Sequence, residues 1–260
     1  MPSHPETLEA NQLDEEPEGA RRSYAGTFDE LLSPEERDRL ESMRAKIDEE
    51  RERAQLEGEV TYERAVKKEA SDGVEAAAND YAAAARLLIN AAADDIALST
   101  REEPRVPNPV QYLKISDALT KQAETVDEDE LMNDTEGRPT NAHDYLSAKA
   151  VKFWDKGIDL LLNADSQPVE LHVPDNPARF VATAVAKAAK DIDETQEYDV
   201  LGDTAETELA EQLEAGGAKE IKSLVSRRLK KEQALQVVGL SSTILQGRLT
   251  DFYSHEFSLT

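Results

Sequence analysis

Residues 62–98, YERAVKKEASDGVEAAANDYAAAARLLINAAADDIAL, decide the fold class. Small and apolar side chains recur there at steps of three and four residues, the period of one helix face. They are Val66, Ala70, Val74, Ala77, Tyr81, Ala84, Leu88 and Ala92. Because alanine lets neighbouring backbones approach closely, we expect this stretch to be the central core helix, with an interruption at Asp72-Gly73 near one end.

Helices are predicted on both sides of this stretch. Ser33-Pro34-Glu35-Glu36 is a capping box with proline at the first helical position, so a helix should run from Pro34 towards Leu56. Its narrow apolar stripe comprises Leu40, Met43 and Ile47. Further on, apolar spacing predicts helices over about 110–126 and 141–162. The acidic loop that begins at Asp127 lacks the ligand spacing and the glycine of a calcium loop.

The second half of the chain continues the helical pattern. Asp175-Asn176-Pro177 predicts a helix start, Asp203-Thr204-Ala205-Glu206 a capping box, and Gly216-Gly217 a break between an acidic and a basic helix. Between the predicted helices, Val169 to Val173 alternate apolar and polar residues, as a short half-buried strand does. Without a convincing second strand, this segment pairs across subunits or forms an extended connector.

These patterns predict an all-α protein, a bundle of long helices with at most one short strand near 168–173. We expect a flexible N-terminal arm, because residues 1–27 are polar and proline-containing, and an extended C-terminal tail. The predicted parts are an arm (1–27), a helical core (28–165), a strand or connector plus helix (166–203), and C-terminal helices carrying a basic segment and an aromatic tail (204–260).

The composition indicates a salt-rich environment. Fifty-five Asp and Glu face thirty Lys and Arg along the whole chain, giving a net charge of -25, and cysteine is absent. Self-repulsion of that size opposes folding in dilute buffer, whereas molar salt shortens the Debye length to about 3 Å. In general character the chain resembles halophilic archaeal proteins, which implies folding in a salt-rich cytoplasm.

Several function classes find no support in the sequence. No apolar stretch is long enough to span a membrane, and the first residues lack the layout of a signal peptide, so we expect a cytoplasmic or virion-assembled protein without membrane contact. The absence of cysteine removes thiolate metal sites and nucleophiles, and the four histidines show no paired ligand spacing. We therefore predict no catalytic residue, no metal site and no cofactor.

A basic segment near the C-terminus runs against the charge of the chain. Six cations stand against one acid, Glu220, over residues 219–231: Lys219, Lys222, Arg227, Arg228, Lys230 and Lys231. These cations are predicted to contact nucleic acid or an acidic protein neighbour. Alternatively, they form a solvated helix face that neutralises acidic surface of the same molecule.

The following residues add a weak helix-turn-helix resemblance. Residues 233–245 place Gly239 where the turn would lie and Leu245 where it would pack back, and Gln246 and Arg248 are the candidate reading residues. The resemblance covers about twenty residues. It departs from the usual pattern because Leu235 occupies the position of a small residue. The resemblance implies DNA binding by this segment.

An aromatic tail ends the chain. Phe252, Tyr253, Phe257 and Leu259 are predicted to dock into a neighbouring subunit, although the tail can equally fold back on its own core. Together, these features favour a non-enzymatic structural or assembly subunit of a homo-oligomer or larger complex. Its narrower form is a connector or adaptor of a tailed archaeal virus. The alternative is a DNA-binding regulatory or packaging protein that uses the basic segment.

Overall fold

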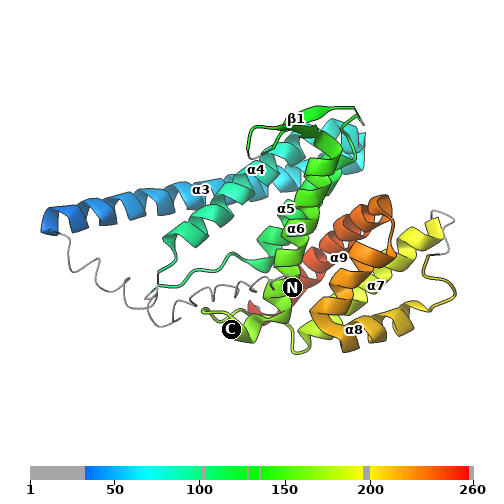
Figure 1. Ribbon diagram of the computed structural model, residues 1–260. Helices are drawn as coiled ribbons and strands as arrows, with labels where there is room; N and C mark the ends of the chain where they lie inside the picture. Colours follow the sequence, from blue (N-terminus) through cyan, green and yellow to red (C-terminus); the bar gives the residue numbers. More distant parts are fainter. Residues whose placement is uncertain (1–32, 101–102, 128, 135, 196–199, 258–260) are drawn as a thin grey trace, which may run out of the picture. The chain divides into compact units, whose positions relative to one another are not determined.

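The computed structural model describes residues 33–100, 103–127, 129–134, 136–195 and 200–257 (Figure 1). The predicted arm, residues 1–27, and Leu259 lie outside these described residues. The described elements are α3 (Pro34–Asp72), α4 (Val74–Leu98), α5 (Pro109–Ala123), β1 (Leu131–Asn133), β2 (Pro139–Asn141), α6 (Ala142–Leu162), the 3-10 turn η1 (Ala164–Ser166), α7 (Pro177–Thr195), α8 (Glu206–Ser223), the π-helix η2 (Leu224–Arg228) and α9 (Lys231–Phe257). The all-α prediction is confirmed.

The described residues divide into two units, one that ends at Lys46 and one that begins at Ile47. In the first unit, the predicted capping box begins α3: Ser33 N donates to Glu36 Oε2 at 2.8 Å, and Glu36 N donates to Ser33 Oγ at 3.3 Å. Every residue from 33 to 46 is exposed, including the apolar Leu40 and Met43. This stretch is therefore a charged helix without a buried face.

In the second unit, Gly73 separates α3 from α4. Its φ of 89° is a left-handed conformation that favours glycine, so the predicted interruption is confirmed. The predicted boundaries differ, however, because α3 continues through residues 56–62 to Asp72 and is one helix instead of parts of two. The two helices pack antiparallel, with Gly58 against Leu88 and Tyr62 edge-on to Tyr81.

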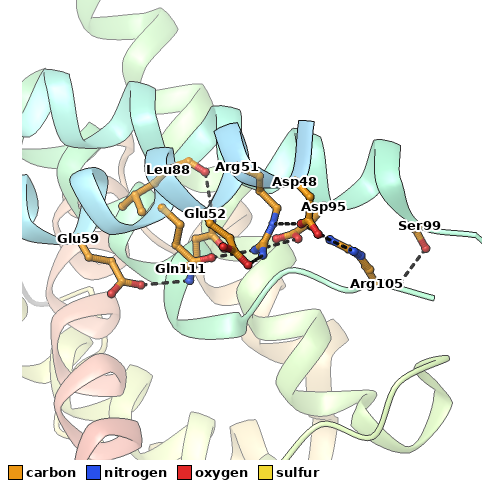
Figure 2. Close-up of polar contacts among 10 residues, drawn as sticks. Asp48, Arg51, Glu52, Glu59, Leu88, Asp95, Ser99, Arg105 and Gln111 are labelled. Atoms are coloured by element: carbon orange, nitrogen blue, oxygen red, sulfur yellow. Dashed lines mark hydrogen bonds and ion pairs between the residues drawn. The ribbon is translucent and has the colours of Figure 1, made fainter. Parts of the chain in front are cut away.

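A polar network fastens α3 to α4 and to the connector that follows (Figure 2). Arg105 donates to both carboxylate oxygens of Asp48, at 2.6 and 3.1 Å, and Arg51 lies 3.2 Å from Asp95. The Arg105 guanidinium lowers the pKa of Asp48, whereas burial raises that of Asp95 despite the nearby arginines. Gln111 Nε2 donates to the Leu88 carbonyl at 2.9 Å. The network fixes the inner face of α3.

The core of this unit is centred on α5, which packs against α4, α6 and α9 (Figure 1). The predicted helices at 110–126 and 141–162 are confirmed as α5 and α6, which begin at asparagine caps, Asn108 and Asn141. The Trp154 indole of α6 is fully buried and donates to Ser241 Oγ of α9 at 3.0 Å. Helix α7 begins at Pro177, as predicted.

The predicted strand near 168–173 is absent among the described residues. Val169, Leu171 and Val173 are half-buried and Glu170 and His172 are exposed, so the alternation is real. The segment nevertheless pairs with no strand and forms an extended connector, since backbone partners are required for a strand. The described strands, β1 and β2, instead form a short antiparallel hairpin that begins within the predicted acidic loop, with Met132 opposite Thr140.

Two predicted boundaries in the C-terminal part are wrong. The capping box at 203–206 does not form, because α8 begins two residues later than that box requires, with Ala205 as its N-cap and without a side-chain cap. The predicted helix-turn-helix is one continuous helix, α9, with buried Gly239 in its interior. A Cβ at Gly239 would lie 2.7 Å from Thr120 Cγ2, so the glycine serves close packing of α9 on α5 instead of a turn.

The predicted extended tail is also corrected, because α9 continues through Phe257. Phe252 and Tyr253 are half-buried on this helix, with their rings in edge contact at 5.5 Å. The Tyr253 hydroxyl donates to the His172 carbonyl at 3.0 Å, so this end of α9 packs on its own chain. In the described residues, none of the helices combines the length and the apolar character of a membrane span.

Candidate functional site

The predicted basic helix is a bend built from three elements. Residues 219–231, here called the basic bend, comprise the last turn of α8, the π-helix η2 and the first residue of α9. Gly217, with φ 56° and ψ -151°, kinks α8 just before it, where a glycine break was predicted. Leu229 is extended and ends the π-helix. The cations therefore do not share one helix face.

Lys222, Arg228 and Lys231 of the basic bend pair with acids of the same chain. Lys222 Nζ lies 2.7 Å from Asp159 Oδ2 and 4.0 Å from Asp155 Oδ2. Arg228 pairs with Glu220, and Lys231 pairs with Asp144 of α6. The Lys231 contact holds the pKa of Asp144 below its usual range. These three cations follow the alternative interpretation, in which the segment neutralises acidic surface of its own molecule.

The remaining predicted contact residues divide between the bend and a separate position. Lys219, Arg227 and Lys230 are exposed, and within the described residues Lys219 and Arg227 form no ion pair. Arg248 lies elsewhere, because its guanidinium donates to Thr183 Oγ1 of α7 at 2.7 Å. The structure therefore brings six of the seven predicted cations together and leaves Arg248 outside the bend.

An apolar groove lies beside the basic bend, between α6, η2 and α9. Its volume is about 480 Å³. Apolar side chains form most of its lining: Ala148, Val151, Val225, Leu229, Ala234 and Leu235. The Asp144–Lys231 ion pair and Ser226 also line it. A groove of this kind accepts apolar side chains of a partner, with charged groups at its margin.

One polar group in the groove has no partner. Ser147 is 5% exposed, lines the groove and, within the described residues, has no hydrogen-bond partner for its Oγ. An unsatisfied buried hydroxyl costs free energy, about 1–3 kcal/mol, so a molecule that bonds to it on binding recovers part of that cost. The adjacent π-helix, closed by Leu229 N donating to the Leu224 carbonyl at 3.2 Å, is a form of helix that recurs at functional sites.

A second polar cluster lines a pocket of about 430 Å³ that is open to solvent at Val66 and Thr243. The Asp117 carboxylate of α5 accepts from Tyr62 Oη of α3 at 2.5 Å and from Thr243 Oγ1 of α9 at 3.1 Å. Close by, Glu69 accepts from Tyr81 at 2.5 Å and from Lys121 at 2.8 Å. These side chains, with Glu124, are here called the buried network. No pattern in the sequence predicted this network.

Burial governs the ionisation of the buried network. It raises the pKa of Asp117 to about 6, against the opposing effect of hydrogen bonds from Tyr62 and Thr243. Burial also raises the pKa of Tyr62, and Asp117 adds to that shift. For Glu69, burial is outweighed by the bonds from Lys121 and Tyr81, so its pKa is lowered. Asp117 therefore exchanges its proton near pH 6.

The buried network connects helices by hydrogen bonds. Asp117 joins α3, α5 and α9, and its hydrogen bonds already engage both carboxylate oxygens. A proton acceptor with a pKa near 6 could serve acid–base chemistry. Both groups that donate to it are, however, fixed side chains of the protein. Among the described residues, no group of three histidines and carboxylates is placed to hold a metal ion.

No protein family model, curated protein or solved structure matches this chain.

Proposed function

We propose that this protein is a non-enzymatic assembly subunit of a larger complex in a salt-rich setting, and that the groove beside the basic bend is a contact site for a protein neighbour. The observation that carries the proposal is the groove itself. Three features support a protein-binding site there: the apolar lining, the buried Ser147 hydroxyl without a hydrogen-bond partner among the described residues, and the exposed Arg227 that follows Ser226 of the lining.

The neighbour is expected to be an acidic protein surface instead of nucleic acid. A DNA contact needs several cations free to meet phosphates, whereas Lys222, Arg228 and Lys231 are already paired within the chain. The continuous helix α9 also removes the predicted recognition helix. An apolar groove, moreover, offers nothing to a phosphate backbone but suits a protein side chain.

Cross-linking in extracts of the cells that produce the chain tests the proposal. In molar KCl, a zero-length carbodiimide reagent should join Lys219 or Lys230 to a carboxylate of another polypeptide, and the complex should survive nuclease. A chain that migrates as a monomer in such extracts would overturn the proposal.

Nucleic-acid binding is the competing outcome. The purified protein should not bind a short DNA duplex, even at the lowest salt at which it stays folded. Binding that weakens steeply with salt and is lost in Arg227→Gln/Lys230→Gln would replace the proposal by the DNA-binding alternative. The salt-rich setting has its own measurement, since circular dichroism should show unfolding on dialysis to low salt.

A narrower form of the proposal is a connector or adaptor of a tailed archaeal virus. Such a subunit acts as one of several copies in a ring, and a ring requires that each copy present two different contact surfaces.

A further inference from the structure

We infer that the occupant of the groove is a second copy of this chain, which inserts the outward face of α3 at Leu56 and Val60. The inference rests on the proposed function, because it names the neighbour that the groove binds. Both surfaces belong to residues 47–260, and they lie on different elements. One copy can therefore present its own α3 while its groove binds α3 of a different copy.

The outward face of α3 has the features of an inserting helix. Leu56 and Val60 are 65% and 56% exposed, and they lie one turn apart on the same side. Residues 56–63, LEGEVTYE, also carry Glu57, Glu59 and Glu63, whereas the exposed Arg53 and Arg64, one turn to either side of Leu56 and Val60, are paired with Glu49 and Asp80. This segment is here called the acidic ridge. Exposed apolar residues at a spacing of four are the anchors with which a helix enters a groove.

The acidic ridge is held rigidly from behind. On the inner face of the same helix, Gly58 packs against Leu88, and Tyr62 is bonded to Asp117. About two and three turns before Gly58, Arg51 and Asp48 join the network of Figure 2. Because these contacts fix the rotation of α3, Leu56 and Val60 point outward before binding, and little ordering cost remains.

The acidic ridge and the groove match in apolar character and in charge. The ridge offers two exposed apolar side chains, and the groove has a mostly apolar lining. Glu57, Glu59 and Glu63 make the ridge acidic, while the exposed Arg227 directly follows Ser226 of the groove lining. Since molar salt screens charges beyond about 3 Å, we expect the apolar contact to supply most of the affinity.

A contact between ridge and groove can be repeated in two ways. In a two-fold dimer, each copy inserts its acidic ridge into the groove of the other, so that residue i contacts residue j and j contacts i. When the contact is made in one direction only, it is heterologous, and repeated from copy to copy it produces a ring or an open chain.

Complementation between two variants tests the inference. Leu56→Ser/Val60→Ser removes the ridge anchors, and Ala148→Glu places a carboxylate in the groove; all three positions are exposed, so the fold should tolerate the changes. Ile96→Ser, with 56% exposure, and Ala93→Glu on exposed α4 positions are the matched controls. Sedimentation velocity in molar KCl reports the mass of each sample across a concentration series.

The wild-type chain and both controls should assemble, whereas each ridge or groove variant should associate about tenfold more weakly or remain monomeric. An equimolar mixture of the two variants should form dimers and nothing larger, because one intact ridge meets one intact groove. A wild-type chain that stays monomeric, variants that assemble like the wild type, or a mixture without dimers would each overturn the inference. The proposed function survives these results if the cross-links of Lys219 or Lys230 lead to a different protein.

Discussion

The basic bend and the buried network both gather ionisable side chains, yet they use them differently. The bend collects its cations within residues 219–231, and three of them pair with acids on α6 and α8. The buried network collects its groups from far-separated positions, from Tyr62 to Thr243, and fixes three helices through Asp117. Local clustering in the sequence therefore marks the surface site, whereas tertiary packing alone creates the internal one.

The largest predicted effect concerns pH and the buried network. Folding raises the pKa of Asp117 from 3.8 to about 6, so between these values the folded state binds more protons than the unfolded chain. The wild type should therefore lose stability relative to Asp117→Asn as pH rises through this window, by about 3 kcal/mol. Urea unfolding of both proteins at several pH values in molar KCl measures this difference.

Asp48→Asn provides a control of opposite sign. Arg105 lowers the pKa of Asp48 in the folded state, so the wild type should lose stability relative to this variant as pH falls through the lowered pKa. If Asp117→Asn and the wild type respond to pH in parallel, then Asp117 is not the carboxyl that titrates near pH 6. The buried network and the basic bend would then no longer differ in the way proposed above.

Helix packing in the network region is tested next. Thr120, whose hydroxyl donates to the Ser116 carbonyl at 3.0 Å, would meet a new Cβ in Gly239→Ala at 2.7 Å. We expect the steric clash to lower the free energy of unfolding by about 1–3 kcal/mol. Replacing glycine by alanine within a helix offsets this loss by about 0.5–1 kcal/mol. Thermal unfolding measures the net change.

Gly247→Ala, on the same helix, is the matched control. No atom lies within 4 Å of a Cβ at Gly247, so this variant should be stabilised by about 0.5–1 kcal/mol. Equal stabilisation of both variants would show that α9 does not approach α5 closely at Gly239. The packing of Gly239 against Thr120 would then be wrong.

The sequence predicts those parts of the fold that depend on neighbouring residues. The Gly73 break and the caps at Ser33 and Asn176 are local, and the structure contains them. Gly239 was misassigned because glycine favours both a turn and a close helix contact, and chain order does not distinguish them. Thr120, its contact in space, is more than a hundred residues away.

The sequence predicts the two candidate sites less completely, because their contacts depend on how the helices pack. The basic bend was predicted as a cluster, but its pairing with Asp159 and Asp144 depends on how α6 packs. Asp117 left one signal in the sequence, since it stands within the apolar spacing of α5 between Ile115 and Leu119. A carboxylate at such a position indicates burial with a partner, although nothing in the chain order names Tyr62 or Thr243.

The smallest effects should separate the paired from the unpaired cations of the basic bend. The Lys222 and Asp159 side chains are 31% and 47% exposed, so Lys222→Ala should cost about 0.2–1 kcal/mol of stability. Arg227 forms no ion pair with a described residue, so Arg227→Ala should change stability by less than about 0.5 kcal/mol. Urea unfolding gives both values.

Association should rank the same two variants in the reverse order. Sedimentation should show weaker self-association for Arg227→Ala, because Arg227 is exposed and directly follows Ser226 of the groove lining. Lys222→Ala should change it little, because the Lys222 ammonium is already engaged by Asp159. If Lys222→Ala weakens association more than Arg227→Ala, then the intramolecular pairs of the bend open on contact. The acidic partner would in that case compete for the paired cations instead of meeting the unpaired ones.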